Sequence, residues 1–317
     1  MENTFPLQLI SDFIEYNNLK INNVIKLKGD VSTRKYYRIF SEGENFIISL
    51  YPENLGDDLK RYVNLTRVYE THKIPVPKIL YHDFEKNVAV LEDLGENLLY
   101  ESERERVIKF IDEIFGILKK IRDINLKSNF KYLLDEVKLT DELNFFGKYF
   151  SILIGDGGEE KILEEEFKRI VKKTLEDYPM VFCHRDFMVR NMIEKNERIF
   201  IIDFQDSTYG PFFYDISSFL NDSLTLEFSE ITYLFKKFTE MINVKRENAL
   251  ENFMYTSLQR SLKALGTFSK QIYLGKNKYI PLFSHSLKKS LFYIEEIGNF
   301  PNIKRFVEKG FFLLKKN

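Results

Sequence analysis

The sequence predicts an α+β fold with two lobes, a small antiparallel β-sheet lobe followed by a larger, mostly helical lobe. Two observations support this fold class. Short apolar or aromatic runs between turn residues dominate the N-terminal part, whereas amphipathic helical periodicity dominates the remainder. We expect the lobes to span residues 1–93 and 94–317, with a cleft between them, because strands come first and helices second with a short hinge between.

The N-terminal lobe is predicted to contain five strands and two helices. A first helix starts near Pro6 and ends at Asn17, since Pro is favoured in the first turn of a helix. A second helix over 57–72 stops before Pro75. The expected strands are 24–27, 36–40, 46–51, 79–82 and 88–91.

The C-terminal lobe is predicted to be helical apart from one short β island. Amphipathic periodicity marks the helices, which are expected at 104–123, 133–151 and 159–176 and again from about 211 to the C-terminus. The β island runs from Val181 to Asp203. No internal repeat or low-complexity linker interrupts this pattern.

The composition excludes several classes of protein. The chain has 317 residues, 44% of them hydrophobic and 30% charged, and a net charge of −1, which argues against a general nucleic-acid binder. Cys183 is the single cysteine, so neither an intrachain disulfide nor a cysteine metal cluster can form. The N-terminus lacks the pattern of a secretory signal, and no apolar stretch reaches the ~20 residues that span a bilayer. We expect a soluble cytoplasmic protein without membrane or nucleic-acid partners; the sequence does not indicate its oligomeric state.

The most informative segment runs from His184 to Asn191 and is followed by Asp203 at the end of an apolar run. Phosphoryl transfer from ATP needs hard oxygen ligands for Mg²⁺ and a carboxylate that accepts the proton of the attacking hydroxyl. Asp186 is the predicted catalytic base, and Asn191, five residues later, is a predicted metal ligand. Asp203, twelve residues beyond Asn191, is the predicted principal metal ligand, because the end of a strand holds it rigidly.

The spacing of these residues makes the motif specific. His-x-Asp alone occurs by chance, but His-x-Asp-x4-Asn followed by an Asp at a strand end favours catalysis over a surface loop whose Asp and Asn merely form turns. His184 itself is predicted to be a buried, hydrogen-bonded scaffold residue. We expect residues 186, 191 and 203 to converge in the cleft between the lobes.

With these motifs, the chain resembles the aminoglycoside phosphotransferase and choline kinase superfamily over nearly its whole length. The resemblance implies a bilobal protein-kinase-like fold that binds ATP and Mg²⁺ and acts on a small molecule. It implies a nucleotide-binding loop at residues 29–34, with Ser32, Thr33 and Arg34, and a hinge with Glu92 and Leu94. The position of Asp215 alone indicates an ordinary carboxylate at the start of a helix. The resemblance implies that Asp215 supports the catalytic loop.

One feature departs from that superfamily. Its typical members carry a Lys on the third strand, paired with a Glu on the following helix, to hold the α- and β-phosphates. Here Ser49 lies near the expected Lys, and no acidic residue occurs between Leu59 and Tyr69. We hypothesise that Arg34 or Lys35 supplies the missing positive charge.

A subgroup is closer still. The chain is similar to the N-acetylmuramate/N-acetylglucosamine 1-kinases of bacterial cell-wall recycling, which phosphorylate the anomeric hydroxyl of an amino sugar. Members of this subgroup also lack the strand Lys, although their catalytic loop often has His where this chain has Met188. Three stretches carry the likeness, namely residues 30–38, residues 202–206 with 210–211 and 214–215, and residues 258–268.

The charge pattern near the C-terminus favours a neutral or anionic acceptor. No acidic residue occurs from Asn252 to Ile294, whereas seven lysines and arginines do. A polycationic aminoglycoside would need carboxylates there. Most of these cations are expected on a solvated surface, but Arg260 and Lys263 share a helix face flanked by leucines and are predicted to bind substrate, Arg260 through the lactyl carboxylate of N-acetylmuramate. Further predicted substrate-binding residues are Arg190, Gln205 and Asp206.

Three functions remain in competition at this point. The first is a sugar 1-kinase, and the second is a kinase of another small hydroxylated substrate such as an aminoglycoside, choline or another amino alcohol. The third is a nucleotide-binding module that lost catalysis together with the strand Lys; the presence of Asp186, Asn191 and Asp203 argues against it. A protein kinase is disfavoured, because no Ala-Pro-Glu segment follows Asp203.

Overall fold

The computed structural model describes residues 5–27, 34–102, 104–126, 133–156, 159–222, 226–245 and 247–314. The chain divides into two compact units. Unit 1 comprises Met1–Ile121 together with Arg190–Asp206, and unit 2 comprises Arg122–Val189 together with Ser207–Asn317.

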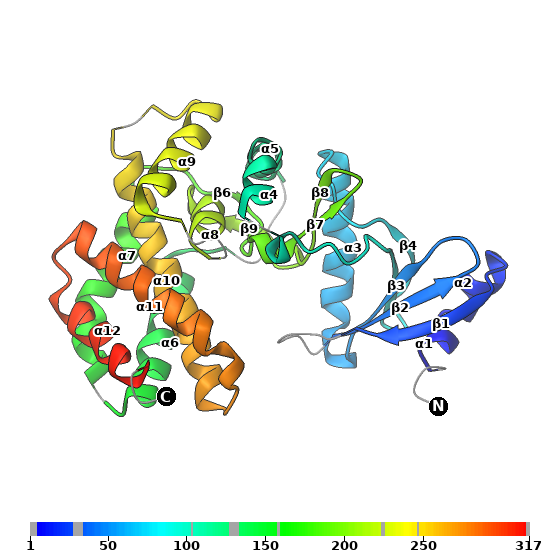
Figure 1. Ribbon diagram of the computed structural model, residues 1–317, viewed down its shortest axis with the longest axis horizontal. Helices are drawn as coiled ribbons and strands as arrows, with labels where there is room; N and C mark the ends of the chain where they lie inside the picture. Colours follow the sequence, from blue (N-terminus) through cyan, green and yellow to red (C-terminus); the bar gives the residue numbers. More distant parts are fainter. Residues whose placement is uncertain are drawn as a thin grey trace. The chain divides into compact units, whose positions relative to one another are not determined.

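Unit 1 is built on a five-stranded antiparallel sheet with the strand order β1-β2-β3-β5-β4, which confirms the five predicted strands (Figure 1). The strands are β1 (Ile21–Lys26), β2 (Lys35–Ser41), β3 (Phe46–Leu50), β4 (Ile79–Asp83) and β5 (Val88–Glu92). The first predicted helix is present as two short pieces, α1 (Phe5–Gln8) and α2 (Ser11–Tyr16).

The two faces of this sheet differ in chemistry because side chains alternate along each strand. One face is apolar and packs against Ile10 and Phe13; its buried members are Val24, Tyr37, Ile39, Phe46, Ile48, Leu50, Val88 and Val90. Tyr36, Arg38 and Ser49 alternate with members of the apolar set and therefore belong to the opposite face. The polar chemistry of the sheet is thus gathered on one side.

A β-hairpin from much later in the chain belongs to unit 1. Its strands are β7 (Met192–Lys195) and β8 (Arg198–Ile201). It is held by the Ile201 N–H, which donates to the Pro75 carbonyl at 2.9 Å, and by Glu194, which pairs with Arg106. Besides α1 and α2, the α-helices of this unit are α3 (Gly56–Thr71), α4 (Arg104–Lys109) and α5 (Ile111–Arg122, of which the last residue belongs to unit 2).

The predicted boundary at residue 93 therefore differs from the division into compact units. Unit 1 continues to Ile121 and takes in the hairpin, because hydrogen bonds join residues far apart in the sequence, such as that from the Ile201 N–H to the Pro75 carbonyl and that from Lys195 to Glu92. Local sequence patterns cannot reveal such contacts.

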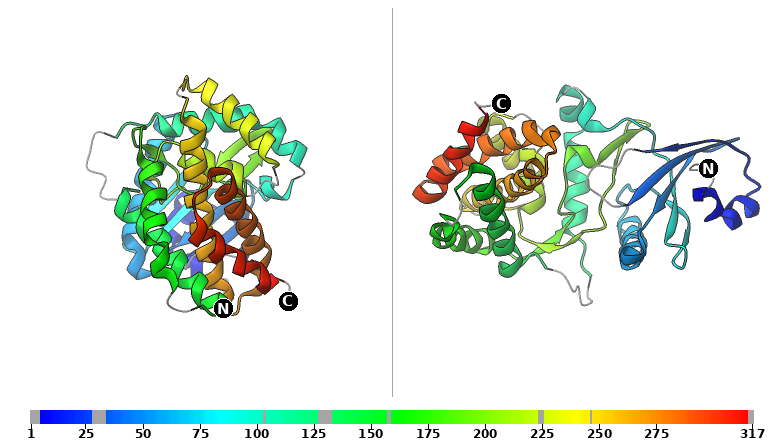
Figure 2. Two further views of the ribbon diagram at one scale, coloured as in Figure 1. Left: turned by 90° about the vertical axis from the view of Figure 1, so that its left-hand side faces the viewer. Right: turned by 90° about the horizontal axis from the view of Figure 1, so that it is seen from below.

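Unit 2 is mostly helical (Figure 2), and buried apolar side chains of its helices form a common core. The long helix α10 packs against α6, α7, α8 and α11. A two-stranded ladder joins β6 (Val181–Cys183) to β9 (Thr208–Gly210), and β6 leads into the His184–Asp186 segment. The helices are α6 (Glu136–Ile154), α7 (Glu164–Leu175), α8 (Tyr214–Asp222), α9 (Phe228–Met241), α10 (Ala249–Tyr273), α11 (Ile280–Ile297) and α12 (Pro301–Leu314).

Gly266 sets the distance between α6 and α10. A Cβ at this position would lie 2.6 Å from the Cα of Phe146 on α6, which is closer than real Cβ atoms approach. Any side chain would therefore push the helices apart. Since Lys263 is one helical turn from Gly266, the close approach brings the polar residues of α10 next to α6.

No helix in the described part of the chain is both long and apolar enough to cross a membrane.

Candidate active site

Unit 1 brings two of the predicted metal ligands to one end of the β7–β8 hairpin. Met192 pairs with Ile201 at this end, and the Ile202 N–H donates to the Asn191 carbonyl at 3.0 Å. Asn191 and Asp203, which are twelve positions apart in the sequence, therefore flank the same end of the hairpin. Both offer oxygen atoms, the ligands that Mg²⁺ prefers.

The Asp203 carboxylate is held by two neighbours. Arg34 Nη2 lies 3.4 Å from Oδ1 of Asp203, and Gln205 Nε2 donates to the same oxygen at 2.8 Å. The Asp203 side chain is 44% exposed, so a cation can reach it from solvent. Its backbone has φ of 62°, in the left-handed region that costs non-glycine residues about 1–3 kcal/mol and that clusters at functional sites.

The residue after Asp203 fastens this segment to α3. The Phe204 ring is fully buried and stacks on both Tyr62 and Tyr69, with centroids 4.9 Å away in each case. Aromatic stacking of this kind stabilises by about 0.5–1.5 kcal/mol per pair beyond area burial. The tyrosines of α3 therefore fix the position of Phe204.

Arg34 lies among aromatic hydroxyls on the polar face of the sheet. Its guanidinium carbon is 5.9 Å from the centroid of the Tyr51 ring. Burial raises the pKa values of Tyr36 and Tyr51, which keeps both phenols neutral. Tyr36, which interacts electrostatically with Arg34, is directly opposite Ser49 in the β2–β3 ladder. Arg34 therefore belongs to the surroundings of the fully buried Ser49 side chain.

The predicted hinge is tied down by a buried arginine that the sequence did not single out. Arg38 Nε lies 2.8 Å from Asp93 Oδ2, both side chains being 8% exposed, and Arg38 also donates to the Gly95 carbonyl and to Glu96. The signal in the sequence for a buried Arg38 was its position inside an otherwise apolar and aromatic strand pattern. Glu92 accepts from Lys195 at 2.9 Å, and Leu94 is buried.

The remaining predicted residues of unit 1 are Ser32, Thr33, Arg190 and Asp206. Ser32 and Thr33 lie outside the described residues. Arg190 lies in the short 3-10 turn Val189–Asn191, and Asp206 follows the buried Gln205.

In unit 2, the segment that carries Asp186 is braced from α8. The Asp215 carboxylate accepts the backbone N–H of His184 at 2.6 Å and that of Arg185 at 3.0 Å, using a different oxygen for each. Burial raises the pKa of Asp215 to about 7, whereas the two N–H bonds and Arg260 favour its ionised form. His184 is fully buried, with its ring edge-on to Phe187.

Cations surround the Asp186 carboxylate. Arg260 Nη2 lies 3.9 Å from Asp186 Oδ1, and the Asp186 side chain is 34% exposed. Burial alone would raise the pKa of Asp186, but the charges of Lys263, Arg260 and Arg185 hold that pKa below its ordinary value. Asp186 is therefore ionised through the neutral range and able to accept a proton.

Arg260 and Lys263 both make contacts within the protein. Arg260 donates to the Arg185 carbonyl at 2.9 Å, and its guanidinium lies 4.5 Å from the centroid of the Tyr214 ring. Lys263 Nζ is 3.1 Å from the Tyr214 hydroxyl and 3.3 Å from Glu142 Oε1. Sequence reasoning paired the two cations correctly on one helix face but missed Glu142. The signal for it was a carboxylate within the apolar stripe of α6 formed by Leu139, Leu143 and Phe146.

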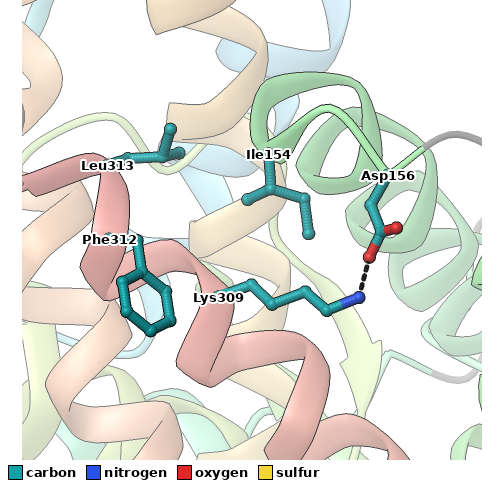
Figure 3. Close-up of a pocket in the computed structure, with 5 residues that line it drawn as sticks. All are labelled: Ile154, Asp156, Lys309, Phe312 and Leu313. Carbon is teal, nitrogen blue, oxygen red and sulfur yellow. Dashed lines mark hydrogen bonds and ion pairs between the residues drawn. The ribbon is translucent and has the colours of Figure 1, made fainter.

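A separate hollow of about 280 Å³ lies where α6 ends beside α12 (Figure 3). It is lined by Ile154, Asp156, Lys309, Phe312 and Leu313, and the Asp156 and Lys309 side chains pair with each other. None of these residues belongs to the predicted site.

Comparison with known proteins shows the family of the chain. The model of the APH phosphotransferase enzyme family matches residues 23–234. The chain belongs to this family. It is therefore a phosphotransferase that acts on a hydroxyl group, as the sequence predicted.

Curated relatives of this APH-family chain are similar over most of their length. The N-acetylmuramate/N-acetylglucosamine kinase of Neisseria meningitidis serogroup B is 26% identical over 291 residues, covering 82% of this chain and 83% of the relative. The protein of the same name from Pseudomonas aeruginosa is 25% identical over 276 residues, covering 81% and 79%.

Solved structures confirm the protein-kinase-like fold of this family. The choline kinase LicA from Streptococcus pneumoniae superposes with a TM-score of 0.62 at 14% identity, covering 89% of this chain and 98% of that one. A thermostable mutant of aminoglycoside phosphotransferase APH(4)-Ia gives a TM-score of 0.63 at 14% identity, covering 91% and 99%.

The oxygen-bearing side chains of Asn191 and Asp203 in unit 1 have the chemistry that magnesium prefers. Among the residues that the structure describes, no cluster of three or more His, Cys, Asp or Glu could hold a metal ion. Mg²⁺ commonly takes only one or two protein ligands and completes its coordination with substrate phosphates and water. Asn191 and Asp203 suit a magnesium ion that arrives with a nucleotide.

Proposed function

We propose that this APH-family phosphotransferase transfers the γ-phosphoryl group of ATP to the anomeric hydroxyl of an N-acetylated amino sugar, N-acetylmuramate, N-acetylglucosamine or both. The observation that carries the proposal is the likeness to kinases of that name over four fifths of the chain. The absence of acidic residues from Asn252 to Ile294 in the sequence supports it, since a polycationic antibiotic would require them.

Asp186 is proposed to be the base that accepts the proton of the sugar hydroxyl. The lowered pKa of Asp186 supports this role, because the group must be ionised before it can accept a proton. Asp215 is proposed to hold the His184–Asp186 segment, because its carboxylate accepts the backbone N–H groups of His184 and Arg185. His184 is proposed to serve as a buried scaffold residue.

Asn191 and Asp203 are proposed to hold magnesium, which would neutralise charge on the β- and γ-phosphates. Arg34, Ser32 and Thr33 are assigned to the phosphates, and the hinge residues Glu92 and Leu94 to the adenine. Arg190, Gln205, Asp206, Arg260 and Lys263 are the residues proposed to contact the acceptor.

The experiment that tests this function is direct. Purified protein is incubated with Mg-ATP and, in separate samples, N-acetylmuramate, N-acetylglucosamine, choline and an aminoglycoside, and the products are examined by ³¹P and ¹H NMR. The expected product is a sugar 1-phosphate. Phosphate on choline or on the aminoglycoside, with none on the amino sugars, would overturn the acceptor assignment.

A further inference from the structure

The residue that precedes Asp186 is held at three points. The Arg185 N–H donates to Asp215, the Arg185 carbonyl accepts from Arg260, and Arg185 Nη2 lies 3.6 Å from Glu142 Oε1. Arg185 has φ of 76°, a left-handed conformation that costs a non-glycine residue about 1–3 kcal/mol and persists only where its surroundings enforce it. The direction of the Asp186 side chain therefore depends on these three contacts.

Glu142 is the member of this group that comes from α6. Only 8% of its side chain is exposed, and its second oxygen, Oε2, accepts from Gln259 Nε2 at 3.0 Å. A carboxylate this deeply buried is tolerated only with charged and hydrogen-bonding partners. Burial would raise the pKa of Glu142, but Lys263, Gln259 and Arg185 outweigh it and the pKa is lowered, so the group is an anion.

The charges around Asp186 come from three helices of unit 2 and from the loop of Asp186 itself. Lys263 and Arg260 belong to α10, Asp215 to α8 and Glu142 to α6, while Arg185 and His184 belong to the loop. Three permanent cations thus face Asp186, and Glu142 lies between two of them, Lys263 and Arg185. Without Glu142, the full charge of both would act on Asp186 through a partly buried medium, where Coulomb interactions are stronger than in water.

We propose that Glu142 is a positioning residue for phosphoryl transfer: it holds the Arg185 and Lys263 side chains and offsets their charge, so that Asp186 keeps both its direction and its basicity. This inference rests on the role of Asp186 as base, whichever hydroxyl acceptor is used. A purely structural Glu142 would only join α6 to α10 and would leave the proton affinity of Asp186 unchanged.

The test compares Glu142→Gln with Asp141→Asn, a matched control that removes an exposed carboxylate from the adjacent position of α6. The rate at saturating ATP and acceptor is measured across the pH range, with whichever hydroxyl compound the wild-type enzyme phosphorylates. In E142Q we expect kcat to fall on the order of tenfold with the KM for ATP unchanged, because a weaker base slows proton transfer. We also expect the acid limb of the pH profile to move to lower pH, whereas D141N should match the wild type.

A double variant separates the charge effect from a structural one. E142Q/K263M removes one anion and one cation, so the acid limb should return toward its wild-type position. The proposal is overturned if E142Q keeps wild-type kcat, or if kcat falls while the acid limb stays in place. It is equally overturned if the double variant shifts the limb further than E142Q does.

A further variant covers the case in which E142Q does not fold. E142D keeps the charge but shortens the side chain by one methylene, so kcat should fall while the acid limb stays at its wild-type pH; a shifted limb would contradict the proposal. Wild-type enzyme that ignores amino sugars but phosphorylates another alcohol would overturn the acceptor assignment alone. The Glu142 test would then proceed with that alcohol.

Discussion

The two carboxylates at the centre of the proposed chemistry lie in contrasting surroundings. Asp203 in unit 1 is 44% exposed and faces one arginine, Arg34, at 3.4 Å. Asp186 in unit 2 lies among three cations, one of which, Arg260, is 3.9 Å away, and its loop is hydrogen-bonded from α8 and α10. A carboxylate that recruits a divalent cation has to be reachable and lightly paired. A base has to stay ionised without attracting that cation, and fixed positive charges achieve both.

The two surroundings share one backbone feature. Asp203 itself and Arg185, the neighbour of Asp186, both have left-handed φ values. In each case aromatic stacking or hydrogen bonds hold the strained residue, through Phe204 in unit 1 and through Asp215 and Arg260 in unit 2. Strain of this kind is concentrated where a side chain must point in a direction that relaxed backbone would not give it.

The largest expected effect concerns Asp186. Asp186→Asn should lower kcat by about 10²–10⁴-fold, the range ascribed to general acid–base catalysis, while ATP still binds. Steady-state kinetics and calorimetric titration with ATP measure the two quantities. Near-normal turnover of this variant would show that Asp186 is not the base, and the different surroundings of Asp186 and Asp203 would then have no catalytic meaning.

The next effect tests the cation beside Asp203. Arg34→Ala should weaken ADP binding roughly tenfold, because a charge-assisted contact to phosphate is lost, while AMP binding is unchanged. Lys35→Ala provides the comparison: Lys35 is exposed and, by strand alternation, belongs to the apolar face of the sheet rather than to the face of Ser49. Weaker ADP binding in K35A but not in R34A would show that Lys35 carries the missing charge.

A destabilising effect is expected in unit 2, where an added methyl group at one glycine has no room. Gly266→Ala should destabilise the protein by about 1–3 kcal/mol, since the new Cβ would press on the Phe146 backbone and separate α6 from α10. Gly116→Ala on α5 is the matched control, because nothing lies within 4 Å of its added Cβ, and it should stabilise by about 0.5–1 kcal/mol. Chemical denaturation measures both, and equal effects would contradict the close approach at Gly266.

The last prediction distinguishes two roles of Arg260. If Arg260 binds the lactyl carboxylate, Arg260→Met should raise the KM for N-acetylmuramate about tenfold and leave that for N-acetylglucosamine unchanged, because only the first sugar carries that anion. If its bond to the Arg185 carbonyl is its sole role, kcat should fall equally with both sugars. Separate kinetic runs with each sugar decide between the two outcomes.

Local patterns in the sequence predicted much of the fold. The five strands of the sheet and the long amphipathic helices are present, because alternating and 3.6-residue periodicities directly reflect which side chains are buried. The spacing of Asp186, Asn191 and Asp203 was also available from the sequence, since it belongs to one short segment of chain.

Only the tertiary structure decided the contacts between distant segments. Glu142 lies next to Arg185 and Lys263 because helices that are far apart in the chain pack closely at Gly266, and no pattern within α6 identifies its partners. The hairpin of residues 192–201 belongs to unit 1 for the same reason. Periodicity reports whether a side chain is buried, whereas the identity of its neighbours depends on how whole elements pack together.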